Sequence, residues 1–156
     1  MSELYDTDRR PVMDGSAGFP LISEAVILTG SKRWIMLRKD GLLSPVRAEV
    51  GHAENSYSAV RDRILLDTGI TVGTGAVLFT GLFSAPEGAG ECLMDIWVFR
   101  LSEKDDELKA SYQWLCTVSS DEAIECIENG SFSDLGETEK LRGIFTICET
   151  PVCVDF

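Results

Sequence analysis

The stretch AEVGHAENSYSAVRDRILLDTGI, which spans residues 48–70, decides how the rest of the chain is interpreted. Either Asn55 or Ser56 can cap a helix here, because both side chains can accept a hydrogen bond from a backbone N–H of the first turn. Gly69 closes the segment, and glycine readily adopts the left-handed conformation that ends helices. Between these two signals the apolar residues recur with helical spacing: they are Ala59, Val60, Ile64, Leu65 and Leu66. The pattern predicts a helix that stops at Thr68.

Strands are predicted on both sides of this helix. Two short apolar runs, residues 25–28 and 34–37, are separated by a turn and predict a buried hairpin. Residues 41–51 alternate only weakly, as in a short strand or a loop. Residues 71–83 and 91–102 are rich in β-branched and aromatic side chains, which predicts two long strands that pair with each other.

The last part of the chain predicts one more strand and two helices. Residues 112–118 alternate cleanly and indicate the strand. Ser119, with Glu122 three residues later, has the spacing of a capping box and begins a helix that ends at Asn129. Apolar residues at spacings of three and four predict a last helix over residues 137–148.

This order of elements predicts an α+β fold with a mixed sheet flanked by helices, because strands and helices follow no repeating β-α-β period. A chain of 156 residues is long enough for one core. We expect an N-terminal arm over residues 1–22, a single domain over 23–150 and a C-terminal tail over 151–156.

The composition of the chain disfavours several classes of partner and of catalytic site. Fourteen basic and 26 acidic side chains give a net charge of -12, which disfavours binding to nucleic acid. No apolar run is long enough to cross a bilayer, so we expect no membrane partner. The five cysteines show no C-x-x-C spacing and suit a reducing cytoplasm. The single histidine, His52, makes a histidine-rich zinc site or a Ser-His-Asp triad improbable.

The spacing of residues 48–70 resembles the box of the Nudix hydrolases, G-x5-E-x7-R-E-U-x-E-E-x-G-U, where U is a bulky apolar residue. Anchoring on Gly69 places Glu54 on the first glutamate of the box and Asp67 on its last acid. Residues 81–88 also resemble the proline-containing loop of the ADP-ribose pyrophosphatase branch. The resemblance covers most of residues 24–147 and implies an α/β/α sandwich. It also implies Mg²⁺-dependent hydrolysis of a nucleoside diphosphate linked to another group, such as ADP-ribose.

The box is degenerate at the positions that matter for metal binding. Alanine replaces its first glycine at position 48, and Asp62 replaces its arginine. The three helix glutamates that resemble metal ligands fall on Arg63, Leu66 and Asp67, so one acid of three is kept. Mg²⁺ requires several oxygen ligands, and leucine and a guanidinium supply none. Shifting the register by one residue puts leucine at both later positions.

The remaining candidates divide into catalytic, metal and ligand-binding residues. Glu54 and Asp67 are the candidates for catalysis and for one weak Mg²⁺ site, and Glu49 and Glu91 could add a carboxylate. Arg63 lies four residues before Asp67, which predicts either an ion pair on one helix face or a direct contact with a diphosphate. The candidate ligand-binding residues are Arg63, Glu91 and Pro86. Strand aromatics that could stack on a base, or simply fill the core, are Trp34, Phe83, Trp97 and Trp114.

Three functional hypotheses follow. The first is a Nudix-fold protein without hydrolytic activity, which binds a nucleotide or acts as a protein-interaction module. The second is a weak or divergent Mg²⁺-dependent hydrolase that uses Glu54, Asp67 and a later acid such as Glu91 or Glu137. The third is an unrelated α+β structural domain. The acidic surface favours a protein partner with basic patches, and an oligomer is compatible with the sequence.

Overall fold

The structure is a computed structural model, and it describes residues 19–51, 54–85, 90–102 and 113–147. A mixed seven-stranded sheet forms its centre, in the order β3-β2-β1-β6-β5, with β4 paired to β1 and β7 paired to β2. β1 and β6 run parallel, and the other pairs are antiparallel. The strands are β1 (Leu21–Leu28), β2 (Trp34–Lys39), β3 (Leu42–Ser44), β4 (Val46–Glu49), β5 (Gly75–Ser84), β6 (Glu91–Arg100) and β7 (Leu115–Val118).

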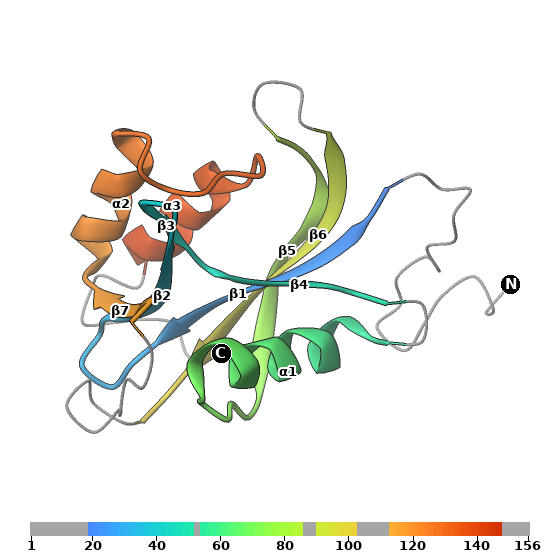
Figure 1. The fold of residues 1–156 in the computed structure, drawn as a ribbon, viewed down its shortest axis with the longest axis horizontal. Coiled ribbons are helices and arrows are strands. Elements are labelled where there is room, and N and C mark those ends of the chain that lie inside the picture. Colours follow the sequence, from blue (N-terminus) through green and yellow to red (C-terminus); the bar gives the residue numbers. More distant parts are fainter. Residues whose placement is uncertain (1–18, 52–53, 86–89, 103–112, 148–156) are drawn as a thin grey trace, which may run out of the picture.

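Helices cover both faces of this sheet. The helix α1 (Ser56–Thr68) lies on one face, and α2 (Ser120–Glu128) and α3 (Thr138–Ile147) lie on the other (Figure 1). Alternate residues of β1 explain the two layers, because Ala25 and Ile27 pack with the α1 side, whereas Val26 and Leu28 pack with α2 and α3. The predicted α+β fold with a mixed sheet between helices is therefore confirmed.

The boundaries of α1 agree with the signals read from the sequence. Asn55 is the cap, and its side-chain oxygen accepts the backbone N–H of Ser58 at 2.8 Å. At the other end Gly69 has a φ of 75°, and its N–H bonds the carbonyl of Leu65 at 2.9 Å. Ser56 anchors the first turn to the sheet instead, because its buried hydroxyl accepts a hydrogen bond from Trp97 Nε1 at 2.9 Å.

Most other predicted elements are present with shifted ends. The predicted capping box at Ser119 and Glu122 is confirmed, with both of its reciprocal hydrogen bonds formed. The strand expected from residue 71 starts at Gly75, and the first strand already begins at Leu21, within the predicted arm. Tyr112 and Cys148, which the sequence placed in the adjoining strand and helix, lie outside the described residues.

Candidate functional site

A cleft of about 430 Å³ opens between β4 and α1. Three carboxylates and two guanidinium groups line it together with small or apolar side chains, so the cleft is polar and has mixed charge. The lining residues are Arg47, Ala48, Glu49, Glu54, Ala59, Asp62, Arg63 and Leu66. Most of these residues belong to the 48–70 segment that resembles the Nudix box.

The helix α1 presents one face to the cleft. Ala59, Asp62, Arg63 and Leu66 recur at spacings of three and four, and all four line it. Leu66, which lines the cleft, is 64% exposed. The resemblance places a metal-binding glutamate at this position, and the side chain that stands there has no atom able to bind a cation.

Arg63 and Asp67 form the ion pair that their spacing predicts. The Nε of Arg63 lies 3.0 Å from Asp67 Oδ2, and its NH2 nitrogen lies 3.0 Å from Oδ1, so the carboxylate is held by two parallel contacts. The Asp67 side chain is 9% exposed, whereas that of Arg63 is 41% exposed. Asp67 does not line the cleft, and its charge is compensated by a cation that does.

The other predicted site residues are dispersed. Glu54 lines the cleft, and its Oε1 accepts the backbone N–H of Gly51 at 2.8 Å. Glu91 starts β6, where it accepts a hydrogen bond from Ser84, and it does not line the cleft. Pro86 and His52 lie outside the described residues. Within the described ranges there is no group of three or more histidine, cysteine or acidic side chains placed to hold a metal ion.

The aromatic candidates are mostly core residues. Trp34 is fully buried and packs edge-on against Phe145 at 5.1 Å between ring centroids, so of its two predicted roles it fills the core. Trp97 packs against Tyr57, at the first turn of α1. Trp114 is 43% exposed, and its Nε1 donates to the carbonyl oxygen of Asp67 at 3.0 Å. Its indole therefore braces the end of α1 near the Arg63–Asp67 pair.

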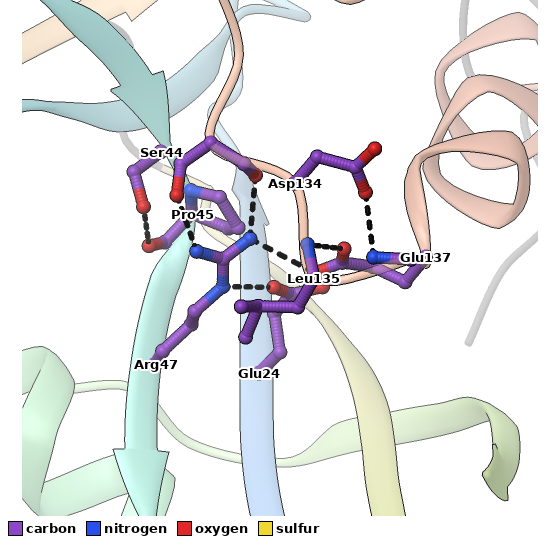
Figure 2. Close-up of polar contacts among 9 residues, drawn as sticks. Glu24, Ser44, Pro45, Arg47, Asp134, Leu135 and Glu137 are labelled. Atoms are coloured by element: carbon purple, nitrogen blue, oxygen red, sulfur yellow. Dashed lines mark hydrogen bonds and ion pairs between the residues drawn. The ribbon is translucent and has the colours of Figure 1, made fainter. Parts of the chain in front are cut away.

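A buried ionic cluster, absent from the sequence interpretation, fixes the β4 wall of the cleft. Arg47 reaches from β4 between two fully buried carboxyls (Figure 2): its Nε lies 2.7 Å from Glu24 on β1, and its NH2 lies 2.9 Å from Glu137 before α3. It also donates to the side chain and the carbonyl of Ser133, both at 2.6 Å. Glu137 was predicted as a later catalytic acid, but this clamp holds it inside the protein.

The chain before α3 can approach the sheet this closely only because of Gly136. Its φ is +102°, a conformation that other residues rarely adopt. A Cβ atom at this position would overlap the carbonyl oxygen of Ser84. The close approach brings Ser133 and Glu137 within reach of Arg47.

The pKa values of the two carboxyls in this cluster shift in opposite directions. Burial raises the pKa of Glu24 well above its usual value of 4.5, and the neighbouring Glu137 raises it further. Burial also opposes ionisation of Glu137, but its hydrogen bond with Glu24 and the charge of Arg47 outweigh that effect and lower its pKa. Of the two carboxyls, Glu24 therefore has the higher pKa and Glu137 the lower. Glu24 Oε2 is buried and has no hydrogen-bond partner among the described residues.

Glu24→Gln is expected to flatten the dependence of stability on pH. Because the folded-state pKa of Glu24 is raised, the stability it contributes is complete below the unfolded-state value near 4.5 and is lost as the pH rises through the folded-state pKa. Glu137 has a lowered pKa and loses its contribution only as the pH falls below 4.5. Urea unfolding at about pH 5 and about pH 8 should show a decline in the wild type that the variant lacks. Equal declines in both proteins would contradict a raised pKa of Glu24 in the folded state.

Comparison with solved structures identifies this architecture. The sequence matches no family model and no curated protein. The Nudix domain of Shewanella oneidensis NrtR, solved in complex with ADP ribose, superposes with a TM-score of 0.63 at 12% identity, over 84% of this chain and 90% of that domain. The chain has the Nudix fold.

Two further solved structures with the Nudix fold also superpose on this chain. The Ap4A hydrolase of C. elegans gives a TM-score of 0.57 at 11% identity, covering 80% of this chain and 92% of the hydrolase. A NUDIX hydrolase from Nitrosomonas europaea gives a TM-score of 0.55 at 14% identity, covering 75% of this chain and 93% of that hydrolase. At these identities the similarity establishes the shared fold, and the activity has to be argued from the residues in the cleft.

Two further observations concern the environment of the protein. None of the helices in the described ranges has the length and apolar character that crossing a bilayer requires. The three cysteines within those ranges, Cys92, Cys116 and Cys126, carry free thiols.

Proposed function

We propose that this chain is a non-hydrolytic Nudix-fold module that binds a nucleoside diphosphate derivative in the cleft between β4 and α1. The observation that carries the proposal is the Arg63–Asp67 ion pair on the cleft-facing side of α1. It puts a fixed positive charge where the resemblance places a metal-binding carboxylate. ADP-ribose is the first ligand to test, because the NrtR domain of the same fold was solved with it.

The charges in the cleft favour binding over hydrolysis. Cleavage of a diphosphate at neutral pH needs bound metal to neutralise developing charge and to activate water. The two-point contact with Arg63 neutralises the Asp67 carboxylate, and the neighbouring Leu66 contributes no ligand. The guanidinium of Arg63 remains 41% exposed, and guanidinium groups match phosphate oxygens well. Diphosphate binding by this route requires no metal ion.

The proposal is tested by thermal unfolding with ADP-ribose, once with Mg²⁺ and once with EDTA. Ligand at about a hundred times its Kd should raise the Tm by roughly 5–10 °C in both conditions. Arg63→Gln should weaken binding by about 10- to 100-fold, because a charge-assisted hydrogen bond is lost. Arg61→Gln is the matched control, since Arg61 is on the same helix, is 43% exposed and does not line the cleft. It should leave binding unchanged.

Asp67→Asn separates recognition from structural support. This variant keeps the Arg63 cation and removes its partner charge, so binding should persist. Loss of binding in Asp67→Asn to the same extent as in Arg63→Gln would mean that Arg63 acts only through the structure of α1. If no nucleotide derivative shifts the Tm of the wild type, the binding proposal fails, and a protein-interaction role for this module takes its place.

A second candidate function rests on the remaining acids of the cleft. Glu49, Glu54 and Asp62 all line it, and they could bind one Mg²⁺ weakly, with Glu54 as the catalytic group. This is the weak hydrolase of ADP-ribose-like compounds. Incubation with Mg²⁺ or Mn²⁺ and chromatographic separation of products distinguishes the two functions. Turnover at an ordinary enzymatic rate, lost in Glu54→Gln, would establish the hydrolase and overturn the non-hydrolytic proposal.

A further inference from the structure

Trp114 is held between the sheet and the C-terminal end of α1. Its backbone carbonyl accepts the N–H of Arg38, on β2, at 2.7 Å. Its indole Nε1 donates at 3.0 Å to the carbonyl of Asp67, which lies in the last turn of α1. The last four carbonyls of a helix have no N–H partner within the helix, so this hydrogen bond satisfies one of them. The backbone of Trp114 is thus tied to the sheet and its ring to the helix.

The ring that is held in this way is also exposed to solvent. Trp114 is 43% exposed, whereas Trp34 is fully buried and Trp97 is partly buried. The Nε1 atom of Trp114, its one polar side-chain atom, is engaged by Asp67, so the surface that the ring offers is apolar. Leu66, which precedes Asp67, is 64% exposed and lines the cleft. Two large apolar side chains are therefore exposed at one end of α1, beside the cleft.

Asp67 connects this ring to a cation of the cleft. Its carbonyl bonds to Trp114, and its carboxylate holds Nε and NH2 of Arg63, both at 3.0 Å. A guanidinium carries five N–H donors in a planar fork, so a contact through Nε and NH2 leaves the edge that includes NH1 for a ligand. An anion bound to that edge and the ring of Trp114 are separated by a single aspartate residue.

We propose that the base of the ligand stacks on the ring of Trp114 while its diphosphate binds Arg63. The inference rests on the proposed function and adds the chemical class of the ligand, a nucleotide derivative with a planar base. Aromatic rings bind bases through their faces, and every base has such a face. Because Nε1 is already engaged by Asp67, the indole binds the base without forming a hydrogen bond to its edge.

Trp114→Leu separates stacking from general apolar contact. Leucine keeps an apolar side chain but has no planar ring, so the Kd of ADP-ribose, measured by titration calorimetry, should rise about 10- to 100-fold. The Kd of inorganic pyrophosphate, which has no base, should stay unchanged. Leu82→Ala is the matched control, because Leu82 is 48% exposed on β5 and does not line the cleft. It should leave both values unchanged.

Trp114→Phe separates the ring from its hydrogen bond. Phenylalanine keeps a planar ring and removes the Nε1 donor, so most of the affinity for ADP-ribose should remain. If the phenylalanine and leucine variants weaken ADP-ribose and pyrophosphate to the same extent, Trp114 acts only by supporting α1 and Arg63. That result overturns the stacking proposal.

Tryptophan fluorescence reports the contact directly. ADP-ribose should quench the emission of the wild type with a midpoint at its calorimetric Kd, and pyrophosphate should not. The change should vanish in Trp114→Phe, because Trp34 packs against Phe145 and Trp97 against Tyr57. Quenching that persists in Trp114→Phe would place the base elsewhere and overturn the proposal.

The choice of ligand distinguishes failure of this inference from failure of the proposed function. If neither ADP-ribose nor pyrophosphate binds the wild type, the proposed function fails, and the stacking proposal fails with it. If ADP-ribose binds the wild type and Trp114→Leu equally well, only the stacking proposal fails. Geranyl diphosphate is the competing probe, since its chain is apolar but not planar. Tighter binding than ADP-ribose, retained in Trp114→Leu, would assign the exposed surface to an aliphatic chain and overturn the inference.

Discussion

Replacing Arg47 by methionine is expected to lower the free energy of unfolding by about 3–5 kcal/mol, the usual effect of leaving buried charge without its partner. Arg47 is the cation between Glu24 and Glu137, whose side chains are both fully buried. Methionine replaces the length of the side chain but none of its four hydrogen bonds to Glu24, Ser133 and Glu137. Urea unfolding measures the loss directly.

Arg33→Met is the matched control for this prediction. Arg33 forms its ion pair with Glu122 at the surface, where the two side chains are 37% and 55% exposed, and it also donates to the side chain and the carbonyl of Thr117. Exposed pairs contribute at most about 1 kcal/mol, so this variant should unfold almost as the wild type does. The defect of Arg47→Met should also be smaller at about pH 5 than at about pH 8, because protonation removes the uncompensated charge. If Arg47→Met lowers the free energy of unfolding no more than Arg33→Met does, the buried cluster does not stabilise the fold in the way described.

The second prediction with a large effect is a gain of affinity for a divalent metal ion. Arg63→Glu combined with Leu66→Glu places acids at positions 63, 66 and 67, and it frees Asp67 from its present partner. Residues at this spacing lie on one helix face, so their carboxylates can share a cation. We expect affinity for Mn²⁺, measured by titration calorimetry or by the loss of the free-ion EPR signal, to rise at least about ten-fold.

The control for this gain changes the same residue types on another part of α1. Arg61→Glu combined with Leu65→Glu alters the net charge equally, but neither residue lines the cleft. It should bind Mn²⁺ no better than the wild type beyond a general electrostatic increase. Equal affinities of the two double variants would show that the 63, 66 and 67 positions do not converge on an ion site. Metal-dependent cleavage by the first variant alone would support descent from an active box.

Elements with local signals were predictable from the sequence. Asn55 and Gly69 enclose α1, and Ser119 with Glu122 begins α2, because capping involves residues only three or four positions apart. The Arg63–Asp67 pair follows from the same kind of spacing. The positions of Glu54 and Arg63 in the cleft could be predicted because they share one continuous segment.

The buried cluster could not be predicted in the same way. Its members come from β1, from β4 and from the segment before α3, so only the folded chain brings them together. One signal was available: Glu24 is the one charged residue of the largely apolar strand β1, and a buried acid needs a partner. The sequence does not reveal which of its 14 basic residues supplies it. The sequence left two roles open for Trp34, stacking on a base or filling the core, for a related reason: its exposure depends on helices that come later in the chain.

The parallel pairing of β1 with β6 has a consequence for biosynthesis. Every residue of β1 from Leu21 to Leu28 has its register partner between Leu93 and Arg100, so the middle of the sheet closes only after about two thirds of the polypeptide has left the ribosome. Until then the apolar nascent segment lacks a neighbour on that side and is open to chaperones. Ribosome-bound chains that stop before β6 should therefore be digested readily by protease, and chains that extend past α3 should resist it.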